Sequence, residues 1–163
     1  IAEALGDVEG LPVDATRIGE CAAAYAAELR ALGDEMDRTL ATVPEASRRL
    51  VTNHESLGYL ADRFDFEIVG AVVPSTSSLG EASARDLDDL AETMRTAGVT
   101  TIFADAAGST EVSEGLAERL GPTASVVPLA VESMGDGDAA TYVEMMRSNA
   151  ATIAEHLGGS APR

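Results

Sequence analysis

Lysine, cysteine and long apolar runs are scarce or absent in this sequence. Its eleven basic residues are all arginine, they face 28 acidic residues, and the formal net charge is -17. Such an acidic surface repels nucleic acid phosphate and anionic lipid, so we expect neither nucleic acid binding nor direct lipid binding. Cys21 is the one cysteine, which excludes an internal disulfide and a multi-cysteine metal site within these residues. No stretch approaches the roughly 18 apolar residues of a membrane helix.

Length and composition fit one compact folded domain. The chain has 163 residues, of which 45% are apolar and 24% charged, and this is enough for a core of its own. It begins with Ile1 and shows no signal peptide pattern at its start. We therefore expect a processed form or a fragment of a longer protein.

A long helix is predicted in the first part of the chain. Residues 1–12 are expected to be irregular, and Asp14 or Thr16 can cap the helix that follows. Apolar residues then recur every three or four positions until Pro44. They are Ile18, Ala22, Tyr25, Leu29, Leu32, Met36, Leu40 and Val43. A helix of roughly 28 residues is ~40 Å long, so part of it is expected to project from the domain or to connect to something else.

Strand patterns and helix patterns alternate after this helix. The predicted strands are Leu50–Asn53, Glu67–Val73, Thr100–Ala104 and Ser125–Val131. Short connections between alternating strands and helices indicate right-handed βαβ units. The predicted fold class is α/β, with a four-stranded parallel sheet flanked by helices and preceded by a long spine helix.

The helices between these strands have recognisable ends. Ser83 and Asp86 form a predicted capping box, and Gly98 ends the helix that they begin. The last helix is expected from about Asp138, and the tail from Gly158 is expected to fray. The predicted buried side of this helix is Tyr142, Met145, Met146, Asn149, Ile153 and Leu157.

Polar residues gather where the predicted strands end. Ligands bind beyond the carboxyl ends of the strands in an open parallel sheet, and these ends share one edge. The polar residues there are Asn53, His54, Glu55, Asp105, Glu132 and Ser133. One imidazole and several carboxylates can form a nitrogen–oxygen metal site, and they can equally supply a general acid and base. Each residue can also be a helix cap or a surface residue.

The positions of several other polar or sulfur-containing residues indicate structural roles. His156 is predicted to lie in a last helical turn, where a cation suits the helix dipole. Met145 and Met146 fit a core stripe better than a soft-metal site. Gly135–Asp138 lacks both the phosphate-binding and the calcium-loop patterns.

Several segments resemble one known family in the same order along the chain. Val51–Leu60, reading VTNHESLGYL, resembles the segment that opens the second lobe of zinc/manganese-type (cluster A-I) ABC-transporter solute-binding proteins. Ile102–Asp105 resembles the third strand of that family with its terminal acid. Val131-Glu132-Ser133 and Thr141–Asn149 resemble the end of the family's sequence. The first helix, with its Tyr25 and Leu32, resembles the interdomain helix.

The resemblance implies a transport protein of two lobes that hold one metal ion between them, and no enzyme. By this resemblance residues 1–44 are the lead-in and interdomain helix, residues 45–163 are the C-terminal lobe, and the N-terminal lobe is absent. The matching metal ligands are His54 and Glu132, although aspartate is usual at the second position. Glu55 or Asp105 is then the expected acceptor for the second ring nitrogen of His54.

The implied cargo is Zn²⁺, with Mn²⁺ as the alternative, because imidazole suits zinc better. Two ligands are half of a site, so weak or absent binding is expected from this lobe alone. The implied partner is an ABC permease in the membrane, and we expect a monomer outside the cytoplasm, in the periplasm or at the cell surface. Whether a lipid anchors the full-length protein, as in the adhesin-type lipoproteins of this family, stays open.

Two other functions remain open on the residues alone. A small α/β hydrolase could use His54 with Asp105 or Glu132, but no serine or cysteine nucleophile elbow follows a predicted strand. The chain could also be an interaction domain that has the same α/β scaffold but binds no metal.

Overall fold

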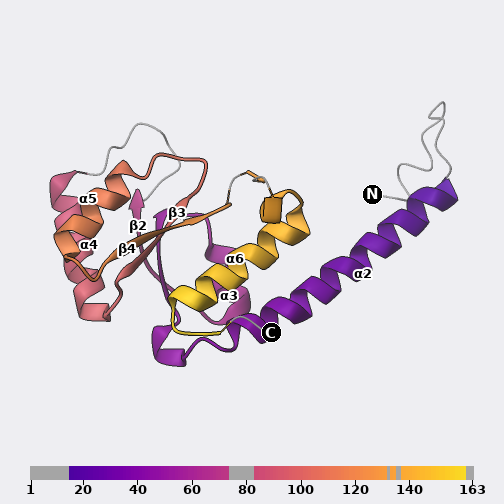
Figure 1. The fold of residues 1–163 in the computed structure, drawn as a ribbon, viewed down its shortest axis with the longest axis horizontal. Coiled ribbons are helices and arrows are strands. Elements are labelled where there is room, and N and C mark those ends of the chain that lie inside the picture. The colour runs from indigo at the N-terminus through magenta and orange to yellow at the C-terminus, as the bar shows by residue number, and fades with distance from the viewer. Residues whose placement is uncertain (1–14, 74–82, 132, 135–136, 161–163) are drawn as a thin grey trace.

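The computed structural model describes residues 15–73, 83–131, 133–134 and 137–160 (Figure 1). The irregular lead-in predicted for residues 1–12 and the loop after Val73 lie outside these ranges. The helices are α2 (Ala15–Leu40), α3 (Gly58–Phe64), α4 (Ala84–Ala97), α5 (Glu111–Leu120) and α6 (Tyr142–His156), with short 3-10 turns at Glu45–Ser47 and Gly137–Ala139. The strands are β1 (Arg49–His54), β2 (Glu67–Val73), β3 (Thr101–Asp105) and β4 (Ser125–Leu129). No helix in the described part of the chain is long and apolar enough to cross a membrane.

The four strands form one parallel sheet in the order β2-β1-β3-β4. The α/β class and the four-stranded parallel sheet predicted from the sequence are therefore confirmed. The last strand was predicted to reach Val131 but ends at Leu129. β4 pairs with β3 alone, and β3 ends at Asp105. Residues after Leu129 therefore have no strand residue to pair with.

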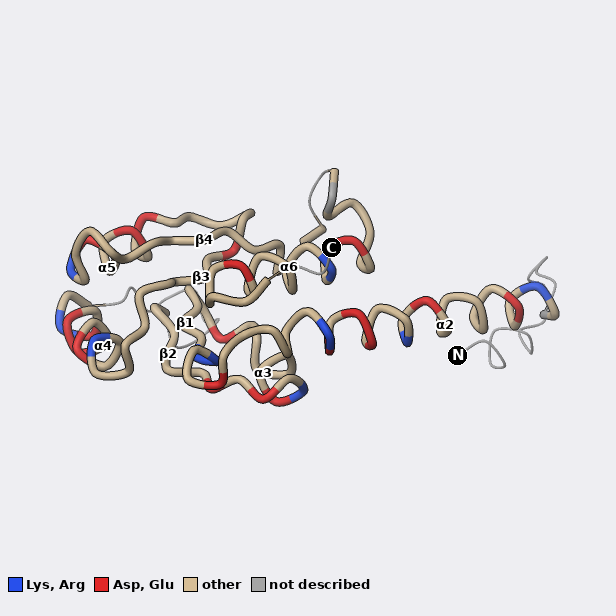
Figure 2. Tube along the Cα trace, turned by 60° about the horizontal axis from the view of Figure 1, so that its bottom comes forward, with Lys and Arg blue, Asp and Glu red and all other residues tan. Residues whose placement is uncertain are grey.

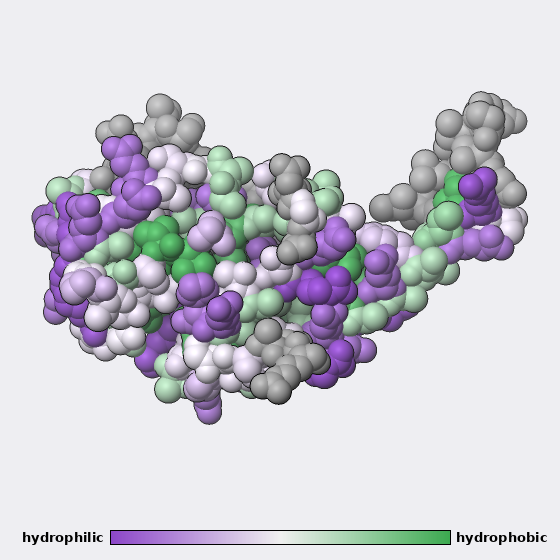
Figure 3. Space-filling model, viewed as in Figure 1, coloured by the Kyte–Doolittle hydropathy of each residue, from purple (hydrophilic) through white to green (hydrophobic). Residues whose placement is uncertain are grey.

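Helices cover both faces of the sheet (Figure 1). On one face α2, α3 and α6 enclose a core with Leu40, Phe103 and Ile153. On the other face α4 and α5 pack over Val51 and Ile102. Hydrophilic residues dominate the outer side of α4 and α5 in Figure 3, as expected for amphipathic helices over a buried sheet.

The long helix α2 is attached to the domain by its C-terminal part only. It has 26 residues and ends at Leu40 rather than near Val43, which is buried after a turn. None of residues 16–31 is buried, and Tyr25 is 46% exposed. The predicted apolar stripe is thus buried only from Leu32 onward, because the first half extends beyond the domain (Figure 2).

Two ion pairs hold the attached part of α2. Arg147 Nε of α6 donates to both carboxylate oxygens of Glu35, at 2.8 and 3.0 Å, and this hydrogen bond raises the pKa of the arginine. On the α3 side, the Arg63 guanidinium donates to the two oxygens of Asp37, at 3.1 and 2.9 Å. Exposed pairs like these stabilise little individually, and they lie beside the buried apolar contacts that attach α2 to the domain.

Helix caps decide where the helices on both faces begin. The predicted capping box of Ser83 and Asp86 is present at the start of α4. An unpredicted second box, Thr141 with Glu144, begins α6, so that helix starts at Tyr142 instead of near Asp138. The placement of Tyr142 on the buried side was wrong: it is 46% exposed in the first turn, and Val143 is buried in its place.

The expected fraying of the tail was also wrong for Gly158–Ser160. The Gly159 N–H donates to the Ala154 carbonyl at 2.7 Å, and Ser160 exchanges hydrogen bonds of 3.0 and 3.1 Å with the Thr42 hydroxyl. A Cβ at residue 159 would lie 2.6 Å from Thr42 Oγ1. Glycine therefore lets the tail lie directly on the end of α2.

Candidate metal site

The strand order places a switch point at the carboxyl edge of the sheet. After β1 the chain enters α3 on one face, and after the neighbouring β3 it enters α5 on the other face. Divergent connections of this kind leave a crevice beyond the two strand ends, where ligands of open α/β sheets bind. His54 is the last residue of β1 and Asp105 the last of β3. The prediction that these residues share an edge is therefore confirmed.

The register brings His54 and Asp105 to the same face of the sheet. Thr52 pairs with Phe103 across the two strands, so His54 and Asp105 each stand two residues further along, and side chains two apart share a face. Asn53 joins the strands there, because its Oδ1 accepts a hydrogen bond of 3.2 Å from the Asp105 backbone N–H.

The imidazole of His54 is enclosed. The residue as a whole is half-buried, but both ring nitrogens, Nδ1 and Nε2, are closed off from solvent. The Ser56 N–H donates to the His54 carbonyl at 2.8 Å and turns the chain towards α3.

The two predicted acceptors for His54 differ in placement. Asp105 is 5% exposed, and its Oδ1 accepts a long hydrogen bond of 3.4 Å from the Ala107 N–H. Glu55 is exposed to solvent. Asp105 is therefore the better placed of the two to act within the crevice.

The second predicted ligand, Glu132, lies outside the described residues, and its neighbour Ser133 is exposed. Among the residues that the structure does describe, no group of three or more His, Cys, Asp or Glu side chains could hold a metal ion together. The described residues at this edge thus include one candidate ligand, His54, with the buried carboxylate of Asp105 on the neighbouring strand.

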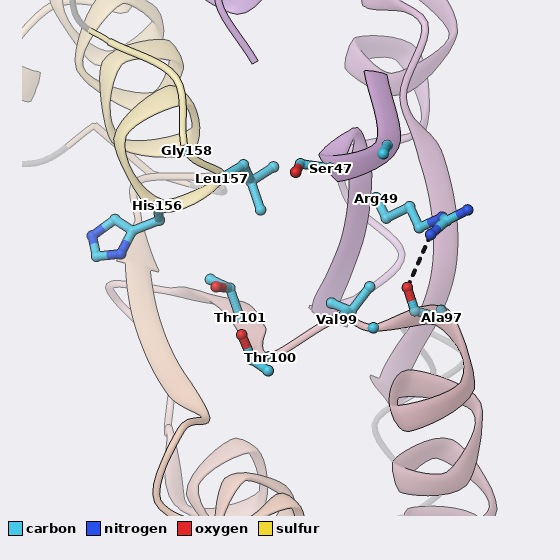
Figure 4. A pocket seen from close by; sticks show the side chains of 11 residues that line it. Ser47, Arg49, Ala97, Val99, Thr100, Thr101, His156, Leu157 and Gly158 are labelled. Atoms are coloured by element: carbon cyan, nitrogen blue, oxygen red, sulfur yellow. Dashed lines mark hydrogen bonds between the residues drawn. The ribbon is translucent and has the colours of Figure 1, made fainter. Parts of the chain in front are cut away.

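The remaining candidates have structural positions. His156 is exposed in the last turn of α6, beside a cavity of about 310 Å³ that also includes Arg49, Thr100 and Thr101 (Figure 4). Arg49 begins β1 and Thr101 begins β3, so this cavity lies at the opposite edge of the sheet from His54. Met145 is buried and Met146 packs against the core, as their helical spacing predicted.

Two asparagines position this edge in ways that the sequence analysis did not predict. Asn53 links β1 to β3, and Asn149 of α6 makes two hydrogen bonds to the backbone of Ala130. The sequence did place Asn149 on a predicted buried face, and a buried amide needs hydrogen-bond partners. The sequence does not show which partners these are.

The sequence of this chain is similar to that of one known protein family. The family model described as the periplasmic zinc-uptake complex component A matches residues 1–156. The chain is 32% identical over 140 residues to the zinc-binding protein TroA of Treponema pallidum, covering 82% of this chain and 45% of that protein. It is 28% identical over 156 residues to the manganese-binding lipoprotein MntA of Bacillus subtilis, covering 91% and 50%.

A solved structure, that of the periplasmic zinc-binding protein TroA from Treponema pallidum, superposes with a TM-score of 0.80 at 27% identity, covering 96% of this chain and 57% of that one. The chain spans about half the length of the curated relatives that it matches. The family match covers almost all of the chain, and the fold agrees with it. This chain belongs to the family of periplasmic zinc-uptake components, whose members bind metal ions for transport and are not enzymes.

Proposed function

We propose that this chain is the C-terminal lobe of an extracytoplasmic solute-binding protein that delivers zinc, or else manganese, to an ABC importer. In this proposal residues 45–163 form the lobe, residues 1–44 include the helix that joins it to an N-terminal lobe, and the ion binds between the two lobes. The observation that carries the proposal is the place of His54, at the end of β1 and at the switch point of the sheet.

The chemistry of the crevice supports a transition metal as cargo. A neutral imidazole is a ligand for Zn²⁺ and for other transition metals, whereas Mg²⁺ and Ca²⁺ prefer oxygen. In the proposal His54 supplies nitrogen, Glu132 supplies oxygen, and Asp105 accepts a hydrogen bond from the second ring nitrogen. The family and the zinc- and manganese-binding relatives support a transition metal as the cargo.

The proposal makes this lobe half of the site. A closed zinc site takes four ligands, and His54 with Glu132 would supply two of them. The isolated chain is therefore expected to bind zinc weakly and to fold without it.

Partners and location follow from the same proposal. The chain would act as a monomer outside the cytoplasm, in the periplasm or at the cell surface, and its outer surface would dock on a membrane permease. With a net charge of -17 it attracts cations over long range, which raises the rate at which they arrive.

Zinc titration tests the proposal. The full-length protein, the isolated chain, and His54→Ala and Glu132→Gln variants of the full-length protein would be titrated against a chelating dye. We expect each variant to lose more than about 100-fold in zinc affinity, since even outer partners of metal ligands are worth about 10–100-fold. A full-length protein that binds zinc equally well without His54 would contradict the proposal.

A further inference from the structure

The two central strands of the sheet lose their pairing at the carboxyl edge. β1 stays paired with β2 to its last residue, His54, and β3 stays paired with β4 to its last residue, Asp105. Between β1 and β3 themselves the pairing goes no further than Thr52 and Phe103. Each central strand thus keeps its outer neighbour to the end, and the ladder is interrupted only between the strand ends that carry His54 and Asp105.

The side chain of Asn53 bridges this interruption. Its Oδ1 accepts a hydrogen bond of 3.2 Å from the Asp105 N–H. The next N–H along the chain, that of Ala106, donates at 2.8 Å to the Leu129 carbonyl on the side of β4. In a regular parallel pair, the acceptor for the Asp105 N–H would be a backbone carbonyl of β1. The carboxamide oxygen of asparagine takes the place of that carbonyl on a longer arm, and it holds β3 to β1 where the backbone pairing has ended.

This bridge joins the two described residues of the proposed site. Asn53 directly precedes His54 in β1, and the N–H that it accepts from belongs to Asp105. Asp105 is 5% exposed, and both ring nitrogens of His54 are closed off from solvent. A change in the separation of the two strand ends would therefore move the imidazole relative to the carboxylate.

We propose that Asn53 is a positioning residue for the metal site, because its side chain sets the separation of the strand ends that carry His54 and Asp105. The inference rests on the proposed function, in which His54 binds the ion and Asp105 accepts a hydrogen bond from the second ring nitrogen. Partners of this kind orient a histidine ligand and are worth about 10–100-fold in metal affinity. Asn53 acts through these two residues and does not itself contact the ion.

The experiment compares Asn53→Leu with Asn53→Asp in the full-length protein. Leucine keeps most of the side-chain volume but removes the acceptor, whereas aspartate keeps an oxygen acceptor on an arm of the same length. Asn53→Ala is a second variant without the acceptor, which serves where leucine prevents folding. Thr42→Val is the control, because it removes side-chain hydrogen bonds in the segment that leads to the start of β1. The readouts are zinc affinity, at a temperature where all variants are folded, and hydrogen exchange of the Asp105 amide.

We expect Asn53→Leu and Asn53→Ala to speed exchange of the Asp105 amide and to weaken zinc binding by about tenfold or more. Asn53→Asp should retain the slow exchange and at least the original zinc affinity, since a nearby carboxylate attracts the cation. Thr42→Val should leave both readouts unchanged.

Two results would overturn the positioning role alone, in a protein that still loses zinc affinity with His54→Ala. One is unchanged affinity in the variants without the acceptor, and the other is an equal loss of affinity in Asn53→Leu and Asn53→Asp. Zinc affinity that is insensitive to His54→Ala would overturn the proposed function and this inference together.

Discussion

Replacing Leu40 by alanine tests how α2 is attached to the lobe. Leu40 is the last residue of α2, is 1% exposed and belongs to the core between α2, α3 and α6. A buried Leu→Ala change costs about 2–5 kcal/mol, because apolar contacts are lost and a cavity remains. For a cost of about 3 kcal/mol, and at about 2–4 °C per kcal/mol for a domain of this size, Tm falls by about 6–12 °C. Thermal unfolding followed by circular dichroism measures this shift.

The matched control is Ile18→Ala in the projecting half of the same helix. No residue from 16 to 31 is buried, and alanine favours helix more than isoleucine does, so the stability of this chain should change by less than about 0.5 kcal/mol. A similar loss for Ile18→Ala and Leu40→Ala would refute the view that only the C-terminal part of α2 is packed. In the full-length protein, by contrast, Ile18→Ala should destabilise if a second lobe covers this half.

The helix caps give two further predictions. Thr141→Ala should destabilise the chain by about 1 kcal/mol, because the Glu144 N–H loses its acceptor. Thr141→Ser keeps a hydroxyl at this position and should be close to neutral. Equal losses of stability for the two variants in chemical denaturation would contradict the capping role. The hydrogen bonds from the Ser83 side chain and backbone lower the pKa of Asp86. The unfolded pKa is about 3.9, so the stabilisation by this carboxylate is complete above that pH and is lost as the pH falls through the lower folded value. Asp86→Asn should therefore destabilise the chain at pH 7, and this deficit should shrink as the pH falls below the pKa of the unfolded carboxyl. A deficit that does not shrink in acid would argue against the ionised cap.

Local signals in the sequence predicted most of the fold. β2 has the predicted limits, Glu67–Val73, because a β-branched run there has clear boundaries. The box of Ser83 and Asp86 marked the start of α4 because both of its partners lie within one helical turn. Tyr142 was misplaced because the cap at Thr141, three residues after the expected start of the helix, changes which residues of the first turn face the core.

Contacts between distant segments could not be predicted in the same way. The hydrogen bonds of Ser160 with Thr42 and those of Asn149 with Ala130 join residues that only the folded chain brings together. The same holds for the site. His54 could be selected as a candidate ligand from its motif, but its place at a switch point depends on the strand order. The enclosure of its ring nitrogens depends on side-chain packing.

The most direct test of the account is anomalous X-ray diffraction at the zinc edge from crystals of the full-length protein grown with zinc. The account predicts one strong peak about 2.0–2.1 Å from a ring nitrogen of His54, with a carboxylate oxygen of Glu132 among the other ligands. A zinc peak at the exposed His156 with none at His54 would contradict the central claim.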